Sequence, residues 1–332
     1  MSFRRASWLL LSIAVLLALP AFSFAQQPEK VWHIGILDVR QRPESVESHP
    51  LYGQFLRRLR ELGYVESKNV SFEWRFAAGD YGRLQGMAAD LVGRRVDVIV
   101  TAASDGIRAA QEATSKIPIV FVGGTDVVAQ GYVKSLAHPG GNTTGFTLLF
   151  GDTIGKQLEL LTTAVPKLSR LAILVNSANS SMAMVQKDFQ RAAEAAKVQI
   201  LFFDARTPQE IEGAFLRAAK EHPQALIWAV DAFFIQQQRQ IAELAERYRL
   251  PSTSGTTEYP EVGGLMGYGP NRPAIWRRIA EYVDRIFKGA NPGDLPVQEP
   301  TTLALVINRK TSKALGLEIP PELLLQADRV IE

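Results

Sequence analysis

Polar side chains that could hold a small ligand follow the apolar segments of this sequence, where strands are expected to end. They are Asp38, Thr101, Ser104 and Asp126 in the first half of the chain, and Thr147, Asn176, Asn179, Asp231 and Glu258 in the second. In open α/β sheets, ligands bind beyond the carboxyl ends of the strands, where loops and helix N-termini offer unpaired N–H groups. We therefore predict that these residues belong to a binding site for a small molecule.

Two of these residues indicate which charges the ligand would carry. Ser104 lies just before the helical segment DGIRAAQEA. Its hydroxyl could cap that helix or, with the exposed N–H groups and the positive end of the helix dipole, receive a carboxylate. Asp231 could accept a charge-assisted hydrogen bond from an ammonium group, with Glu258 in reserve, or it could cap the helix that begins near Phe233.

Neighbouring residues allow two interpretations each. Asn176 and Asn179 could contact the ligand, or they could hold the turn between a strand and a helix. Phe150, Phe233 and Tyr268 could stack on an apolar ligand, or they could pack at an interface between lobes.

Other chemistries find little support in the sequence. The glycine-rich segments GGTDVVAQG and GGLMGYGP match neither GxGxxG nor GxxxxGK[ST], so we predict no nucleotide-binding loop. The four histidines are scattered and cysteine is absent, so we expect neither a metal site nor a disulfide. There is no GxSxG nucleophile elbow, although a catalytic triad need not be local in sequence. We expect no cofactor and no enzymatic activity.

The first residues are typical of a secretory signal peptide. Two arginines precede an apolar run from Trp8 to Leu19, and a small-x-small pattern ends at Ala25. That run is about twelve residues long, short of the roughly twenty that a membrane-spanning helix needs. We therefore expect cleavage after about Ala25 and a periplasmic protein of residues 26–332.

The charge of this mature chain is nearly balanced. Removing two of the 37 Lys and Arg residues with the signal peptide leaves 35 basic against 34 acidic side chains. Nucleic-acid-binding proteins meet phosphates with clustered Lys and Arg, and no such cluster is present. We expect no nucleic-acid partner.

Short apolar, β-rich segments alternate with segments of helical period from residue 31 onward. This alternation predicts parallel sheets covered by helices on both faces, that is, an α/β fold. VDVIV and IPIVFV are apolar at nearly every position, as is typical of central buried strands. The segment His138 to Gly145 interrupts the pattern before a second α/β series begins.

We therefore predict two doubly wound lobes joined by crossover hinge segments. The N-terminal lobe would comprise residues 31–146 and 261–291, and the C-terminal lobe residues 147–260 and 292–332. Two independent doubly wound domains would produce nearly the same pattern.

Several segments carry a resemblance to a known family. LRELGYVESKN near the start, SLAHPGGNTTGF in the middle and SKALGLEIPPELLLQADRVIE at the end resemble the ABC-transporter substrate-binding proteins related to tryptophan/tyrosine-type binding proteins. The resemblance covers nearly all of the mature chain, although Asp105 stands where the family commonly has proline. It implies a type I periplasmic-binding fold, with two lobes joined by three crossovers, and an amino acid or related compound as ligand.

Three functions are consistent with these features. The first is an exported, monomeric solute-binding protein that closes its lobes around a small molecule and delivers it to an ABC permease in the inner membrane. The second is an exported ligand-sensing subunit of a membrane receptor, which uses the same closure. The third is an exported α/β enzyme that acts on a small polar substrate.

Overall fold

The computed structural model describes residues 30–332, so the predicted signal peptide lies outside the described part of the chain. The smaller of two sheets contains five parallel strands in the order β2-β1-β3-β4-β5. Its strands are β1 (Trp32–Asp38), β2 (Val70–Phe76), β3 (Val98–Ala102), β4 (Ile119–Val122) and β5 (Thr143–Phe146). Every residue of β4 is buried, as expected for a strand covered on both faces.

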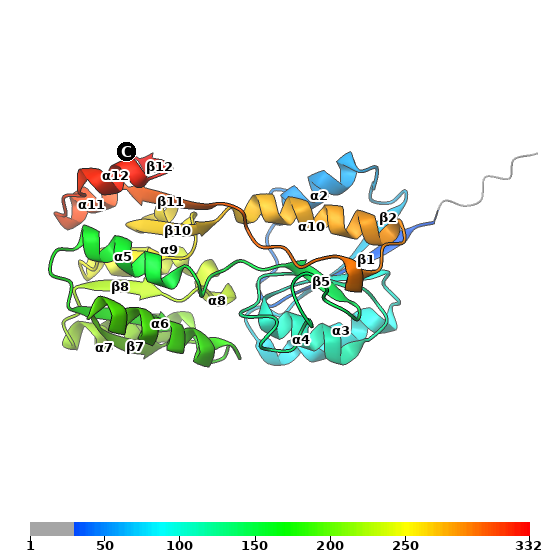
Figure 1. The fold of residues 1–332 in the computed structure, drawn as a ribbon, viewed down its shortest axis with the longest axis horizontal. Helices are drawn as coiled ribbons and strands as arrows, with labels where there is room; N and C mark the ends of the chain where they lie inside the picture. The colour runs from blue at the N-terminus through cyan, green and yellow to red at the C-terminus, as the bar shows by residue number, and fades with distance from the viewer. Residues whose placement is uncertain (1–29) are drawn as a thin grey trace, which may run out of the picture. The chain divides into compact units, whose positions relative to one another are not determined.

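Helices cover both faces of this smaller sheet (Figure 1). On one face, α2 (Tyr52–Glu61) and α10 (Arg272–Phe287) lie side by side over a core that includes Phe55 and Trp276. On the other face, η1 (Tyr81–Arg83), α3 (Leu84–Gly93) and α4 (Ala103–Ala113) enclose a second core. The doubly wound arrangement predicted from the sequence is confirmed for this lobe.

The larger sheet contains seven strands in the order β12-β11-β10-β9-β8-β6-β7. They are β6 (Arg170–Val175), β7 (Gln199–Asp204), β8 (Ala225–Trp228), β9 (Ser252–Ser254), β10 (Met266–Pro270), β11 (Leu303–Asn308) and β12 (Arg329–Ile331). All pairs are parallel except β10 with β11, which is antiparallel. This second lobe is therefore a mixed sheet and not a purely parallel one.

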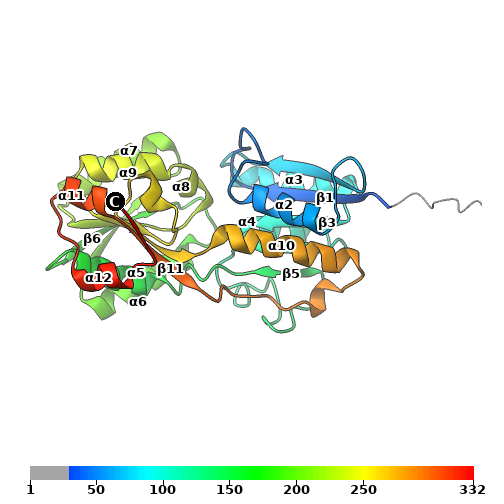
Figure 2. The same ribbon diagram turned by 90° about the horizontal axis from the view of Figure 1, so that it is seen from above.

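Two layers of helices enclose the larger sheet (Figure 2). One layer contains α5 (Ile154–Ala164), α6 (Met182–Ala196) and α12 (Pro321–Gln326). The other contains α7 (Pro208–Lys220), α8 (Ala232–Gln236) and α9 (Gln238–Arg247). The short helices α11 (Arg309–Leu315), η2 (Tyr259–Val262) and η3 (Pro292–Asp294) complete the fold. Across residues 30–332, no helix has the length and apolar character needed to cross a membrane.

The chain passes three times between the two sheets. It crosses after β5, returns between β10 and α10, and crosses again between η3 and β11. At the first and third crossings the two segments run together, because Thr147 donates its backbone N–H to Gln298 and Gln298 donates to Gly145. Paired crossings of this kind are suited to a hinge.

One part of the predicted lobe division needs correction. Residues 261–291 were expected in the N-terminal lobe, but β10 within that range pairs in the larger sheet. The glycines of β10 interrupt the apolar pattern by which a strand is predicted from sequence. A Cβ added at Gly267 or Gly269 would stand 2.1 Å from the carbonyl oxygen of Thr256 or Gly255, so these glycines serve close backbone approach. The other lobe boundaries remain predictions.

Candidate functional site

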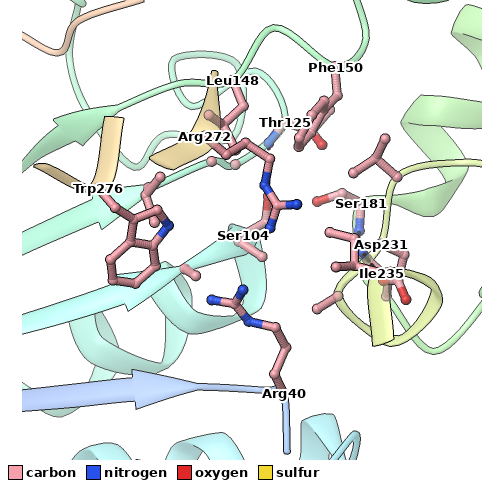
Figure 3. A pocket seen from close by; sticks show the side chains of 18 residues that line it. Arg40, Ser104, Thr125, Leu148, Phe150, Ser181, Asp231, Ile235, Arg272 and Trp276 are labelled. Carbon is pink, nitrogen blue, oxygen red and sulfur yellow. Dashed lines mark hydrogen bonds between the residues drawn. The ribbon is translucent and has the colours of Figure 1, made fainter. Parts of the chain in front are cut away.

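A cavity lies beyond the carboxyl ends of the strands, with walls contributed by elements of both lobes (Figure 3). Its void measures about 640 Å³, including space open to solvent. The polar part of the wall is formed chiefly by Arg40, Ser104, Asn179, Ser181, Asp231 and Arg272. Figure 3 shows the guanidinium groups of Arg40 and Arg272 pointing into this cavity, with Ser181 and Asp231 across from them.

Arg40 is held in place by Asp38, which ends β1. The carboxylate of Asp38 accepts hydrogen bonds from Arg40 Nε at 3.0 Å, from Arg40 Nη2 at 2.5 Å and from the hydroxyl of Tyr52 at 2.9 Å. Burial raises the pKa of Asp38, but the charge and hydrogen bonds of Arg40 outweigh this effect and hold the pKa below its usual value. Asp38 thus lies behind the cavity wall, where it holds Arg40 in position, and does not line the cavity itself.

Arg272 differs from Arg40 in having almost no partner. It begins α10 and is 6% exposed, yet its guanidinium donates no hydrogen bond to any residue in the described part of the chain. Its nearest carboxylate oxygen belongs to Glu258, at 3.6 Å, too far for a hydrogen bond. Burial lowers the pKa of Arg272, Glu258 opposes this and Arg40 adds to it. Because arginine stays protonated, a buried cation faces the cavity, and no acceptor among residues 30–332 lies within hydrogen-bond distance of it.

His49 lies behind the two arginines. Burial and the positive charges of Arg40 and Arg272 lower the pKa of His49 to about 4. Its Nδ1 atom accepts hydrogen bonds from the backbone N–H groups of Leu51 and Tyr52 at the start of α2, at 3.3 and 3.4 Å. The imidazole is therefore neutral at neutral pH and serves as a helix cap.

Replacing His49 with asparagine should flatten the pH dependence of stability. The folded-state pKa of His49 is depressed, so the unfolded chain binds the extra proton between the ordinary value of 6.5 and about 4. In wild type the free energy of unfolding should fall as the pH is lowered through that window. Asparagine can still accept the backbone N–H groups but does not titrate there. Urea unfolding at several pH values would measure the two slopes, and parallel slopes would contradict this role of His49.

Asp231 occupies the opposite wall and is 3% exposed. Oδ1 accepts hydrogen bonds from Asn176 Nδ2 and the backbone N–H of Phe233, both at 2.9 Å. Oδ2 accepts from the hydroxyl of Tyr81 at 2.6 Å and from Asn179 Nδ2 at 2.9 Å. The bond to Phe233 caps α8, so the capping role considered for Asp231 is present, and three further donors share the carboxylate.

Hydrogen bonds connect the lobes beside the cavity. Besides the bond from Tyr81 to Asp231, the backbone N–H of Ser180 donates to the carboxylate of Asp105 at 3.2 Å. Tyr81 is half-buried, and desolvation followed by the charge of Asp231 raises the pKa of its hydroxyl, which therefore remains protonated. These bonds stabilise the two lobes against each other around the cavity.

Ser104 lines the cavity but does not cap α4, because the helix begins one residue earlier, at Ala103. Its hydroxyl oxygen accepts from the backbone N–H of Thr125 at 3.1 Å and from Gln130 Nε2 at 3.3 Å. Ala103 has a φ of 61°, a left-handed conformation that is uncommon for alanine. The strained residue lies in the cavity wall, as such outliers at binding sites often do.

Apolar side chains complete the wall. Trp276, Phe150, Leu148 and Ile235 line the cavity and contribute rings and branched chains from α10, the first crossover and α8. Of the aromatic residues considered from sequence, Phe150 lines the cavity, whereas Phe233 and Tyr268 pack in cores of the larger lobe. A ligand in this cavity would meet cations on one side and apolar surface on another.

The remaining predicted site residues do not line this cavity. Thr101 donates to the backbone carbonyl of Leu37 on the neighbouring strand, and Asn176 positions Asp231. Asp126 is exposed and caps a turn through Ala129, while Thr147 shares with it a separate surface pocket. Glu258 lies behind Arg272 in an adjoining pocket.

Comparison with known proteins identifies the family. The family described as ABC transporter substrate binding protein matches residues 48–331. The chain belongs to this family. A "Tyrosine-binding protein" of Clostridioides difficile strain R20291 is 24% identical over 264 residues, which cover 80% of this chain and 76% of that protein.

Solved structures agree with the fold of this substrate-binding protein. A conserved domain protein from Vibrio cholerae is 25% identical with a TM-score of 0.83, and covers 91% of this chain and 100% of its own. An ABC domain from Streptococcus pneumonia in complex with L-Trp is 24% identical with a TM-score of 0.81 and the same coverage. These likenesses support the two-lobed periplasmic-binding fold.

Sequence reasoning missed four important wall residues of this substrate-binding protein: Arg40, Ser181, Arg272 and Trp276. Arg40 lies two residues beyond Asp38, the last residue of β1, so it is not among the residues that end a strand or directly follow one. Arg272 follows β10, whose glycine-rich sequence does not indicate a strand, so no strand end is predicted just before Arg272. Trp276 lies one helical turn after Arg272, on the same face of α10. Within residues 30–332, no group of acidic, cysteine or histidine residues is arranged to hold a metal ion.

Proposed function

We propose that this chain is the exported binding component of an ABC importer and that its lobes close around an amino acid or a related carboxylic acid with an apolar body. The observation that carries this proposal is Arg272, a buried guanidinium that faces the cavity without a hydrogen-bond partner in residues 30–332. Carboxylates form strong, bidentate hydrogen bonds with arginine. Trp276 and Phe150 supply the surface for the apolar body.

The names of relatives support the same ligand class. One relative is named for tyrosine, and the structure of another was solved in complex with L-Trp. Tyrosine and tryptophan each combine a carboxylate with an aromatic ring. Ligand contacts from both lobes would stabilise the closed state, which a permease in the inner membrane would then recognise. We propose that the mature protein acts as a monomer in the periplasm.

Binding without turnover fits the contacts of the cavity. Among the described residues that line it there is no histidine. The hydroxyl of Ser104 is hydrogen-bonded to the backbone N–H of Thr125 and to Gln130 Nε2, and neither of these groups is a base. Nucleophilic catalysis by serine needs such a base within hydrogen-bond reach. We therefore propose that the protein is not an enzyme.

A thermal-shift and calorimetric screen of residues 26–332 tests the proposal. Ligands that bind the folded state raise the melting temperature, so apolar amino acids and carboxylic acids should raise it while sugars and nucleosides should not. The bound compound should be recovered unchanged. A shift from sugars alone, or conversion of the ligand, would contradict the proposal, and unchanged uptake after gene deletion would contradict the transport role.

A further inference from the structure

We infer that the solute carries a carboxylate but no ammonium group, so that the preferred ligand is an apolar or aromatic carboxylic acid and not the corresponding amino acid. This inference rests on the proposed solute-binding function and narrows its ligand class. It follows from a contrast between the two charged sides of the cavity within residues 30–332. The arginines on one side have N–H donors that make no hydrogen bond, whereas both oxygens of the carboxylate on the other side already accept two hydrogen bonds each.

The cationic side is Arg272 with Arg40. Arg272 offers five N–H donors and makes no hydrogen bond with the described residues, although it is 6% exposed. Arg40 commits Nε and Nη2 to Asp38 and keeps Nη1 without a hydrogen bond to the described residues. A carboxylate placed between them would accept hydrogen bonds from donors that have no acceptor among the described residues, and charge-assisted bonds of this kind are strong.

The anionic side is Asp231 alone, since no other acidic side chain lines the cavity within residues 30–332. A carboxylate has about four lone-pair sites. Four donors already occupy them, two on each oxygen: Asn176 and the Phe233 N–H on Oδ1, and Asn179 and Tyr81 on Oδ2. An ammonium group would have to displace one of these donors to reach Asp231.

The charge balance of the wall points the same way. Among the described residues, two guanidinium groups and one carboxylate line the cavity, so these side chains sum to a positive charge. Glu258 lies beyond Arg272 in the adjoining pocket, and Asp38 is turned toward Arg40. Although Glu258 Oε2 has no hydrogen-bond partner among the described residues, Glu258 does not line this cavity. The ammonium of a zwitterion would therefore lie near two cations, and no oxygen of the described carboxylate that lines the cavity is vacant to accept from it, which is unfavourable.

Matched compounds that differ in one group test the inference by calorimetry on residues 26–332. One series is 3-phenylpropanoate, L-phenylalanine and phenethylamine, and the other is indole-3-propanoate, L-tryptophan and tryptamine. In the series that binds, the deaminated acid should bind about tenfold tighter than the amino acid, as expected when one buried charge lacks a partner. The amine should not bind.

The possible failures are distinguishable. An amino acid that binds as tightly as its deaminated acid, or more tightly, would overturn the inference and leave the proposed solute-binding function intact. Binding of the amines but of neither acid, or no binding in either series, would contradict the carboxylate-binding function as well.

The variant Tyr81→Phe provides an independent readout. It removes the donor at 2.6 Å from Asp231 Oδ2 and so vacates an acceptor position for an ammonium group. The ratio of the amino-acid affinity to the affinity of the deaminated acid should therefore rise in the variant. Any general effect on closure cancels in this ratio. An unchanged ratio would show that Asp231 saturation does not govern the preference, against the inference.

Discussion

Replacing Arg272 with glutamine should weaken binding of the carboxylic acid about thirtyfold or more while leaving the folded protein as stable as wild type, or more stable. Removing one partner of a buried, hydrogen-bonded charge pair costs about 2–5 kcal/mol of binding free energy, which corresponds to this loss. Without ligand, Arg272 is a desolvated cation that donates no hydrogen bond to the described part of the chain, so the neutral glutamine should relieve a cost of folding. Few substitutions are expected to act oppositely on binding and stability.

Arg277→Gln is the matched control for this prediction. Arg277 lies on the same helix, but it is exposed and pairs with Glu61. Exposed ion pairs contribute little to stability, so this variant should bind like wild type and unfold at nearly the same urea concentration. Calorimetry would measure the ligand affinity of both variants, and urea unfolding would measure their stability. Retention of wild-type affinity by Arg272→Gln would remove Arg272 from the ligand contacts.

Replacing Asp38 with alanine should reduce the free energy of unfolding by about 3–5 kcal/mol, because it leaves a buried guanidinium without its carboxylate. Both side chains are buried, with relative exposures of 8% for Arg40 and 1% for Asp38. The pKa of Asp38 lies below its usual value in the folded state, so its stabilisation should be present above the unfolded-state pKa and lost as the pH falls through the folded-state value.

The double variant Asp38→Ala, Arg40→Met separates the ion pair from the packing of these side chains. Replacing a whole buried ion pair with apolar groups is often neutral, so the double variant should recover most of the lost stability. Urea unfolding of the single and double variants gives the comparison. Equal losses in both variants would mean that burial of an unpaired Arg40 is not the cause.

Much of the fold could be predicted because strand and helix periodicity follows directly from burial. VDVIV and IPIVFV overlap β3 and β4, two inner strands of the smaller sheet, as their nearly continuous apolar character predicted. The strands that escaped prediction have other determinants. β5 and β10 contain glycines that permit close backbone approach, and β12 is three residues long.

The site was predicted only in part, for a related reason. The rule that ligands lie beyond strand ends led to Ser104, Asn179 and Asp231, which line the cavity, and their contact with a ligand stays a prediction. It could not show that Asp231 is already hydrogen-bonded by four donors, one of them Tyr81, 150 positions away in the sequence. Nor could it predict Arg272, because Arg272 follows β10, a strand whose glycine-rich sequence does not indicate a strand. Hydrogen-bond saturation is a property of the tertiary structure.

A crystal structure of residues 26–332 with the tightest-binding carboxylic acid tests the central claim most directly. We predict that the carboxylate oxygens lie within about 2.7–2.9 Å of the guanidinium nitrogens of Arg272, with the apolar body against Trp276, since this is the spacing of charge-assisted hydrogen bonds. We also predict that Tyr81 remains bonded to Asp231. A carboxylate bound away from Arg272 would contradict the account.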